Sequence, residues 1–556
     1  MAGFLDVILR GAILVLASLV LGGVVWLRAV LRAAPEASPP PAVARSLSLI
    51  GIAAWLVALA QAATMLIALA EVRAGHWPVA AFMETTFALA ALGRVALGIV
   101  LGVLARRLAR GSGGTLAWSA LGVGSLALVA MSAVLSHAVA RVESRALLLL
   151  LDGGHQLAAA IWIGGLAHLT LYFGLRARER HQPRSVGAAG AGSAGLIGTT
   201  LAPRGAAVFD LERVVGEDTT AVQRFSTLAF ASVVVLVVAG IALTWQYVGE
   251  WAALVGTAYG VMVLSKVLLL AGILVLAAMN RRAVQRAGAG ADPRLRRFVE
   301  VELGLGITVL FAAASLTSLP PAVDVTTDRA TVREVAGRFV PMAPRLTSPP
   351  VGELNARAEP LMAPVTRREP IERAWSEYNH HWAGVFVLTM GLLAALERLG
   401  VRTARHWPLV LLGLAVFLFL RNDPRAWPLG PAGFWESFLL PDVLQHRAFV
   451  VLVVAFALFE WMVRVGRFSA QPWGLVFPLL CAVGGALLLT HSHAMFNLKD
   501  EFLAEVTHAP LGILGTFAGW ARWLELRLPG AGRGPGWFWT GCLIAMGLIL
   551  LVYREA

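Results

Sequence analysis

Long apolar segments follow one another along almost the whole chain, separated by loops that are mostly short and polar. About fourteen of them approach the roughly 20 residues that a helix needs to span the hydrocarbon of a bilayer. We expect helices at residues 4–30, 46–70, 79–105, 115–140, 146–175, 225–248, 257–280, 298–319, 381–397, 406–421, 442–463, 472–490, 507–526 and 536–553. The pattern therefore predicts an all-α, polytopic transmembrane helical bundle of about fourteen helices.

Arginines are concentrated in every second loop between these segments. Loops that remain in the cytoplasm carry an excess of Arg and Lys, so this alternation sets the orientation of the chain. The arginine-rich stretches are 28–45, 106–110, 176–184, 281–297, 398–405, 464–467 and 522–527. With these loops inside, both termini are expected on the periplasmic side of a bacterial cytoplasmic (inner) membrane.

The composition supports a multi-pass membrane protein and argues against other classes. The 556 residues are 58% hydrophobic and only 14% charged, and the mean hydropathy is +0.73, which excludes an ordinary soluble domain. The formal charge of +13 comes from arginines dispersed in loops, so we interpret them as determinants of topology and expect no nucleic-acid partner. Cys481 and Cys542 are too few and too far apart for a disulfide framework or a C-x-x-C motif.

One long outer loop divides the chain. We expect an eight-helix membrane domain at 1–322, a periplasmic linker loop at 323–379 and a six-helix, histidine-rich membrane domain at 380–556. Within the linker, residues 323–339 are compatible with a short helix.

Nine of the twelve histidines fall near helix ends or loops on the predicted outer side. They are His76, His137, His155, His380, His381, His446, His491, His493 and His508. Neutral imidazole is the commonest metal ligand of proteins, and packing alone gives no reason to gather histidines at one level. The distribution favours a metal or haem site at the outer face.

In the first half, Asp152 and His155 are three residues apart and therefore share a helix face. An aspartate one turn from a histidine can orient the ring for a ligand, and Trp162 lies on the same face. Lys266, deep in an apolar segment, is a second candidate for a polar transport path. The alternatives are structural, since Asp152 and His155 could satisfy each other at an interface and Lys266 could snorkel to the surface.

Two further features of the first half concern packing. Gly164 and Gly165 are expected to allow close helix approach, as small residues do in membranes. Glu302, at the start of the eighth segment, is expected to pair with Arg281 or Arg282 as a structural tie.

The second half holds the denser group of possible ligands. His380 and His381 begin the ninth segment, His446 lies near the outer end of the eleventh, and His508 begins the thirteenth. The sequence HSHAM, with His491, His493 and Met495, leaves the twelfth segment. Histidines two residues apart do not share a helical face, so this run suits an unwound helix end. Histidine together with methionine suits copper better than magnesium or calcium. The alternative is that each is an interfacial polar residue.

These residues occur in an order that resembles the CopD/PcoD copper-resistance family of bacterial inner-membrane proteins. The resemblance covers about residues 1–322, and the second half is similar to the extension of longer members. The matching stretches are SHA at 136–138, D-x-x-H at 152–155, WIGGL at 162–166, RFS at 224–226, YG at 259–260, Lys266, NR at 280–281, E-x-E-x-G at 300–304 and LPP at 319–321, with HH, LQHR and LLTHSHA in the second half.

The resemblance implies copper transport or handling across the cytoplasmic membrane, in import or tolerance. It also implies a separate periplasmic CopC-like copper protein as a partner, because the chain shows no fused β-domain rich in histidine and methionine. The outer loop contains Met342 and Met362 but no histidine before His380. Copper would be received at the outer histidines and would pass Asp152, His155, Trp162 and Lys266.

Two other functions stay open at this point. Histidines at matched depth could hold a b-type haem, with His446 and either His491 or His508 as axial ligands. The protein would then be an electron carrier or metal reductase, which is the enzymatic alternative to a non-enzyme. The third possibility is a metal-delivery or assembly partner of another membrane protein. The chain has no P-loop and no D-K-T-G-T, so ATP-driven pumping is not expected.

Overall fold

The computed structural model describes residues 2–73, 77–135, 141, 144–181, 204–287, 293–356, 370–468, 472–490, 499–528 and 533–555. Within these ranges the chain is helical and forms no β-strand, apart from an isolated bridge between Ala426 and Ala432. Twelve helices of the described residues are long and apolar enough to cross a membrane. The prediction of an all-α, multi-pass membrane protein is therefore confirmed.

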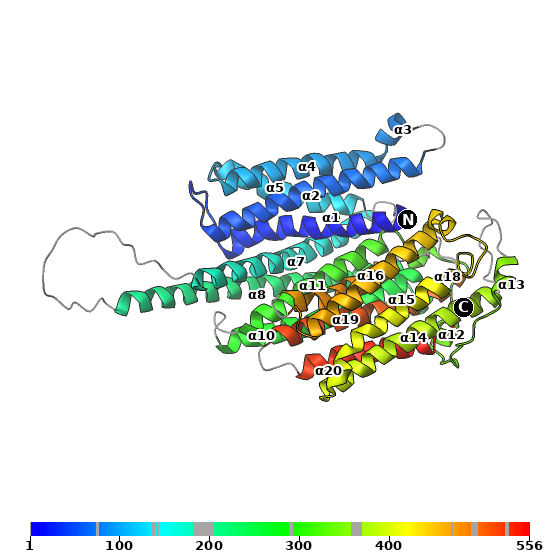
Figure 1. Ribbon diagram of the computed structural model, residues 1–556. Helices are drawn as coiled ribbons and strands as arrows, with labels where there is room; N and C mark the ends of the chain where they lie inside the picture. The colour runs from blue at the N-terminus through cyan, green and yellow to red at the C-terminus, as the bar shows by residue number, and fades with distance from the viewer. Residues whose placement is uncertain are drawn as a thin grey trace. The chain divides into compact units, whose positions relative to one another are not determined.

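The helices of the first half follow the expected order closely (Figure 1). They are α1 (Ala2–Val25), α2 (Pro41–Glu71), α3 (Val79–Met83), α4 (Thr86–Ala109), α5 (Thr115–Val134), α7 (Arg145–His181), α8 (Arg204–Val248), α9 (Trp251–Gly256), α10 (Ala258–Ala287) and α11 (Pro293–Leu316). A π-helical turn, Trp26–Val30, prolongs α1 and buries Trp26.

In the second half, short helices precede and connect the long ones. They are α12 (Val332–Arg338), α13 (Val351–Ala356), α14 (Pro370–Arg398), α15 (Val410–Arg421), α16 (Pro441–Arg464), α17 (Val476–Thr490), α18 (Lys499–Glu505), α19 (His508–Arg527) and α20 (Arg533–Leu551). Helices α14 and α19 correspond to the expected ninth and thirteenth segments, although they are not among the twelve helices counted above as long and apolar enough to cross a membrane. The short helix expected within 323–339 is present as α12.

The chain divides into two compact units. Unit 1 comprises Met1–Thr244 and Leu270–Ala314, and unit 2 comprises Trp245–Leu269 and Ser315–Ala556. The domain limits expected at residues 322 and 380 stay predictions. The outer loop packs into unit 2, where Ala330 and Val335 share a buried cluster with Phe502 and the flanking Val255.

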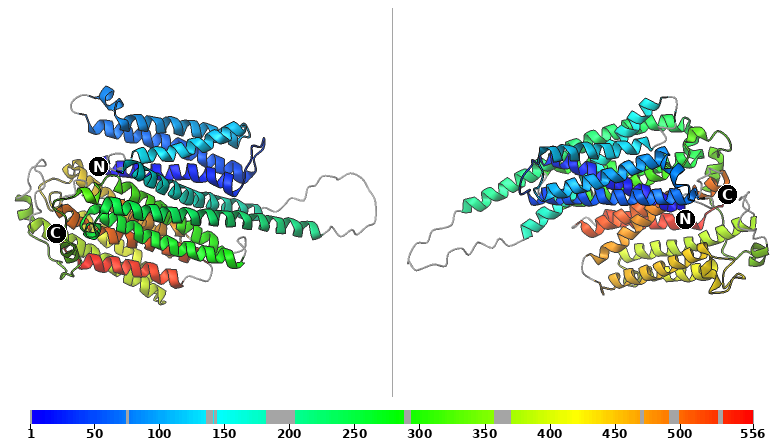
Figure 2. Two further views of the ribbon diagram at one scale, coloured as in Figure 1. Left: turned by 180° about the vertical axis from the view of Figure 1, so that it is seen from behind. Right: turned by 90° about the horizontal axis from the view of Figure 1, so that it is seen from above.

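Close helix packing in unit 1 depends on small residues. Helix α2 packs along α4, and α1 packs on both α2 and α7 (Figures 1 and 2). A Cβ atom added at Gly164 would lie 1.9 Å from the carbonyl oxygen of Ser18, so only glycine fits where α7 crosses α1. Gly165 leaves room for the ring of Phe225 in the same way. The expected role of these two glycines is confirmed.

In unit 2, α14 packs along α20, and α19 packs on both α17 and α20 (Figure 2). The core between them contains Trp407, Phe477 and Trp539. Because α14 and α19 begin at the same end of this unit at which α20 finishes, residues far apart in the sequence meet at each end. One end carries candidate ligands and the other carries arginines.

A charged pair joins two of the short helices in unit 2. Thr331 and Glu334 form a capping box at the start of α12, and the ammonium group of Lys499 lies 2.7 Å from the Glu334 carboxylate. The hydrogen bond from Lys499, followed by those from Thr331, lowers the pKa of Glu334 from 4.5 to about 2. The pair therefore ties α18 to α12 while Glu334 is ionised.

This pair predicts a local dependence on pH. A carboxylate whose pKa is depressed by folding contributes stability above its unfolded pKa and loses it as the pH falls through the folded value. We expect hydrogen-exchange protection of α12, corrected for intrinsic rates, to be constant above about pH 5 and to decrease between about pH 4.5 and about pH 2. The Glu334→Gln variant should show low protection throughout. A wild-type protection that does not change over this range would refute a stabilising role for the pair.

Candidate functional site

His155 of α7 is held against α8 in unit 1. Its Nδ1 atom lies 3.0 Å from the carbonyl oxygen of Leu236, and its ring packs beside Gly240. A carbonyl accepts only from a protonated nitrogen, so this contact fixes the tautomer with the proton on Nδ1 and the lone pair on Nε2. The carbonyl thus orients the His155 ring. The Asp152 carboxylate accepts a hydrogen bond from Gln156 at 3.0 Å.

Trp162 lies two turns further along α7 and is buried. Its indole N–H donates to Oε1 of Glu302 on α11 at 3.0 Å, and the amide of Asn280 on α10 donates to Oε2 at 2.9 Å. Glu302 therefore does not pair with the arginines expected from the sequence; Arg281 lies over the ring of Phe230 instead. This buried carboxylate links three helices of unit 1. In the sequence, Glu302 is marked only by its position two residues after Glu300. That position does not predict Trp162 on α7 as its hydrogen-bond partner.

A second buried polar group of unit 1 was missed by sequence reasoning. Arg94 lies within the apolar span of α4 and is only 5% exposed. Its Nε and Nη2 atoms have no hydrogen-bond partner among the described residues. Ionisable groups inside a membrane span are costly, and their presence generally indicates a function. The sequence feature that could have identified this residue is an arginine about nine residues into an apolar segment.

In unit 2, the structure brings two of the expected ligands together. The ring centroids of His380 on α14 and His508 on α19 are 6.0 Å apart. His380 Nδ1 lies 2.8 Å from the carbonyl oxygen of Ser376, so the Nδ1–H donates there and Nε2 carries the lone pair. The same ring stacks on Tyr553, with 4.1 Å between centroids.

The chain segment after α20 fixes this arrangement from the other side. The hydroxyl group of Tyr553 donates to Oε2 of Glu555 at 2.8 Å, and Ser376 donates to the same oxygen. Glu555 is only 4% exposed. A buried carboxylate and a phenol therefore lie beside the His380 ring, where they limit its movement.

His381, the next residue, has a structural role. Its Nδ1 accepts a hydrogen bond from the backbone N–H of Arg345 at 2.7 Å, and its Nε2–H donates to the carbonyl oxygen of Tyr553 at 2.8 Å. The ring is fully buried. Both nitrogens are thus engaged with backbone, and in this arrangement His381 offers no lone pair to a metal ion.

His446 on α16 is directed to the end of α15. Its Nδ1 lies 2.7 Å from Oδ1 of Asp423, and its side chain is 46% exposed. The neighbouring Arg447 donates to the carbonyl oxygens of Phe419 and Trp427 and so caps α15. An aspartate at Nδ1 directs the other ring nitrogen toward a ligand. His446 is a second outer histidine with an oriented ring.

The remaining candidates divide into two groups. His137, His491, His493 and Met495, together with His76, lie outside the described residues. Lys266 is half-buried on α10, in the part of that helix that belongs to unit 2. Within the described residues, no three His, Cys, Asp or Glu side chains form a group that could hold a metal ion. Among the described residues, the structure therefore brings the rings of His380 and His508 together, but it shows no complete coordination shell.

Comparison with known proteins identifies one segment of the chain. Residues 219–316 match the family model described as Copper resistance protein D. They are a CopD-family segment. This segment runs from α8 to the end of α11 and includes Lys266, Asn280 and Glu302, which confirms the resemblance inferred from the motifs.

The CopD resemblance is supported by one curated relative. The chain is 29% identical over 206 residues to the Copper transport protein CutJ of Bacillus subtilis (strain 168). The match covers 36% of this chain and 31% of the relative, so the chain spans about a third of the length of the relative it matches. No solved structure matches the chain. The candidate histidines of α7, α14 and α19 lie outside the CopD-family segment.

Proposed function

We propose that the protein transports or handles copper across a bacterial cytoplasmic membrane. The observation that carries this proposal is the match of residues 219–316 to the Copper resistance protein D model. The printed name of the relative, a copper transport protein, supports the same cargo. The chain has no motif for ATP hydrolysis, so we propose that copper movement follows a gradient or a coupled ion.

The pair formed by His380 and His508 is the proposed receiving site. Copper–imidazole bonds are about 2 Å long, as in comparable metal sites, so two rings that bind one ion have centroids about 5 to 6 Å apart, the larger value for a nearly linear arrangement. The separation of 6.0 Å in the structure fits this requirement. The hydrogen bond from His380 Nδ1 to Ser376 directs the basic Nε2 atom to the ion. Two imidazoles suit a soft or borderline ion such as copper better than magnesium or calcium.

The remaining ligands and path residues are proposed from the sequence. His137, His491, His493 and Met495 are proposed as additional outer ligands, and His446 as a further one oriented by Asp423. His155, whose Nδ1–H donates to the carbonyl oxygen of Leu236, is proposed with Asp152 and Trp162 to line a transport path in unit 1. Lys266, which belongs to unit 2, is proposed from the sequence as a further transport-path residue. A separate periplasmic CopC-like protein is proposed as the donor. His381 is proposed to position His380 rather than to bind copper, because backbone groups occupy both of its nitrogens.

Copper binding by histidine variants tests the receiving site. We expect the full-length protein in detergent to retain copper after dialysis, and His380→Ala or His508→Ala to weaken binding by about tenfold or more. The matched control is His406→Ala, because His406 lies after α14 at the arginine-rich end and accepts a hydrogen bond from Trp461 at 2.8 Å. Metal content by mass spectrometry and copper titration provide the measurement. Equal retention by all four proteins would overturn the assignment of this pair.

Two further measurements on the same purified proteins distinguish copper transport from haem binding and from metal delivery. A Soret band that is lost in His446→Ala or His508→Ala would identify a haem protein and hence an electron carrier or metal reductase. Uptake of copper into proteoliposomes distinguishes a transporter from a protein that only delivers metal to an assembly partner. Copper retention without uptake, in the wild-type chain, would favour delivery.

A further inference from the structure

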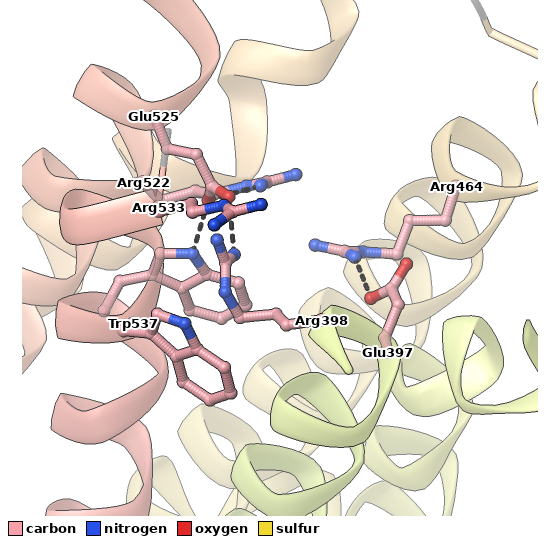
Figure 3. Close-up of a pocket in the computed structure, with 8 residues that line it drawn as sticks. Glu397, Arg398, Arg464, Arg522, Glu525, Arg533 and Trp537 are labelled. Carbon is pink, nitrogen blue, oxygen red and sulfur yellow. Dashed lines mark hydrogen bonds and ion pairs between the residues drawn. The ribbon is translucent and has the colours of Figure 1, made fainter. Parts of the chain in front are cut away.

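Four arginines meet at the end of unit 2 opposite to the His380–His508 pair. They line a cavity of about 480 Å³ together with two glutamates and two tryptophans (Figure 3). The lining residues are Glu397, Arg398, Arg464, Arg522, Glu525, Arg533, Trp537 and Trp539. They come from the ends of α14, α16 and α19 and from the start of α20. The proposed transport function uses none of them.

The carboxylates of the cavity do not neutralise its arginines. Glu525 accepts hydrogen bonds from both Arg398, at 2.5 Å, and Arg522, at 2.6 Å. It also accepts one from Trp539 at 2.6 Å. On the opposite wall, Arg464 bonds to Glu397 at 2.5 Å and to Glu460, behind the lining, at 2.8 Å. Four guanidinium groups thus stand against three carboxylates, Glu460 included, which leaves one net positive charge.

A buried donor without a partner also lines this space. The Arg464 side chain is only 7% exposed, and its Nη2 atom has no hydrogen-bond partner among the described residues. Figure 3 shows its guanidinium group pointing across the cavity toward the group around Glu525. Buried polar atoms are almost always satisfied in native proteins, so an orphaned guanidinium nitrogen indicates a missing acceptor.

The backbone of α20 makes room for a ligand here. A Cβ atom at Gly536 would lie 1.6 Å from Nη2 of Arg398, so glycine lets that guanidinium group lie against the helix. Arg533 and Trp537, one turn apart at the start of α20, are exposed at the edge of the cavity. The N-terminus of a helix carries partial positive charge, which adds to the attraction for an anion.

We propose that this cavity binds a phosphate-bearing anion, supplied either by the headgroup of an acidic phospholipid or by free phosphate. Guanidinium groups bind phosphate oxygens with a planar pair of donors, and basic pockets between helices on the cytoplasmic side bind acidic headgroups. The positive-inside rule assigns this arginine-rich end to the cytoplasmic side, where acidic lipids and soluble phosphate are both available. The exposed Trp537 suits the depth of the headgroups.

Two measurements on the delipidated full-length protein distinguish the sources. Native mass spectrometry measures binding of phosphatidylglycerol against phosphatidylcholine, and thermal unfolding in detergent measures stabilisation by inorganic phosphate against chloride. We expect Arg533→Gln to weaken the preferred anion by about tenfold, because one charge-assisted hydrogen bond is lost. Gly536→Ala, which keeps every charge but displaces Arg398, should also weaken it.

The matched control is Arg467→Gln. Arg467 is exposed at the same arginine-rich end, but it does not line the cavity. Selective binding of phosphatidylglycerol that depends on Arg533 identifies a lipid site, and phosphate stabilisation with the same dependence identifies a site for the free anion. The proposal is overturned if neither anion binds, or if Arg467→Gln weakens binding as much as Arg533→Gln does. Copper retention is independent of these outcomes, so the two proposals fail separately.

Discussion

Replacing Gly164 by alanine is expected to destabilise unit 1 by about 1–3 kcal/mol, the usual cost of adding a methyl group to a well-packed contact. The new Cβ atom would lie 1.9 Å from the carbonyl oxygen of Ser18 and 3.0 Å from Cα of Gly22. Both neighbours are backbone atoms of α1, so no side-chain rotation can relieve the clash. The helices must separate instead, and the contacts between α1 and α7 weaken along their length.

The measurement is reversible unfolding of the purified protein in mixed micelles, followed through tryptophan fluorescence. Gly174→Ala is the matched control, because a Cβ atom at this position on the same helix meets nothing within 4 Å. That variant should be unchanged or more stable by up to about 1 kcal/mol, because alanine is the better helix former. Equal stability of the two variants would show that α1 and α7 do not approach as closely as the structure indicates.

Replacing Glu302 by leucine is expected to cost about 2–4 kcal/mol in the same unfolding experiment. Its carboxylate is the acceptor for Trp162 on α7 and for Asn280 on α10, and the residue is only 4% exposed. A leucine leaves both donors buried without an acceptor, and each such group costs about 1–3 kcal/mol. The loss loosens three helices at once, so copper uptake should fall together with stability.

Glu302→Gln is the conservative comparison for this site. Glutamine retains the volume and one acceptor oxygen, so it should lose about half as much stability as leucine does. A glutamine variant that is as unstable as the leucine variant would mean that the negative charge, and not the hydrogen bonding, holds the three helices together. A leucine variant as stable as the wild-type protein would contradict both accounts.

The adjacent histidines 380 and 381 show where sequence reasoning reached its limit. In the sequence they are an equivalent pair, and both were expected to bind metal. Successive residues on a helix point about 100° apart, so one ring faces α19 and the other is buried against the chain after α20. Only the positions of Arg345 and Tyr553, distant in sequence, assign a structural role to His381.

The arginines at 398, 464, 522 and 533 show the same limit in a different way. The sequence explains each of them as a determinant of topology, since each lies at the end of an apolar segment. Their meeting around one cavity depends on how α14, α16, α19 and α20 pack, which no local pattern contains.

The sequence by itself determined that the chain is a bundle of membrane-spanning helices, because apolar runs of this length can satisfy their backbone in lipid only as helices. It also determined the close approach of α7 to its neighbour, through Gly164, and the CopD resemblance, through the order of short motifs. The tertiary structure alone decided which histidine rings face each other and which carboxylate joins Trp162 to Asn280. The contacts of His380 with His508 and of Trp162 with Glu302 join residues more than a hundred positions apart. Helical periodicity fixes a side chain's direction on its own helix but not the helix that it meets.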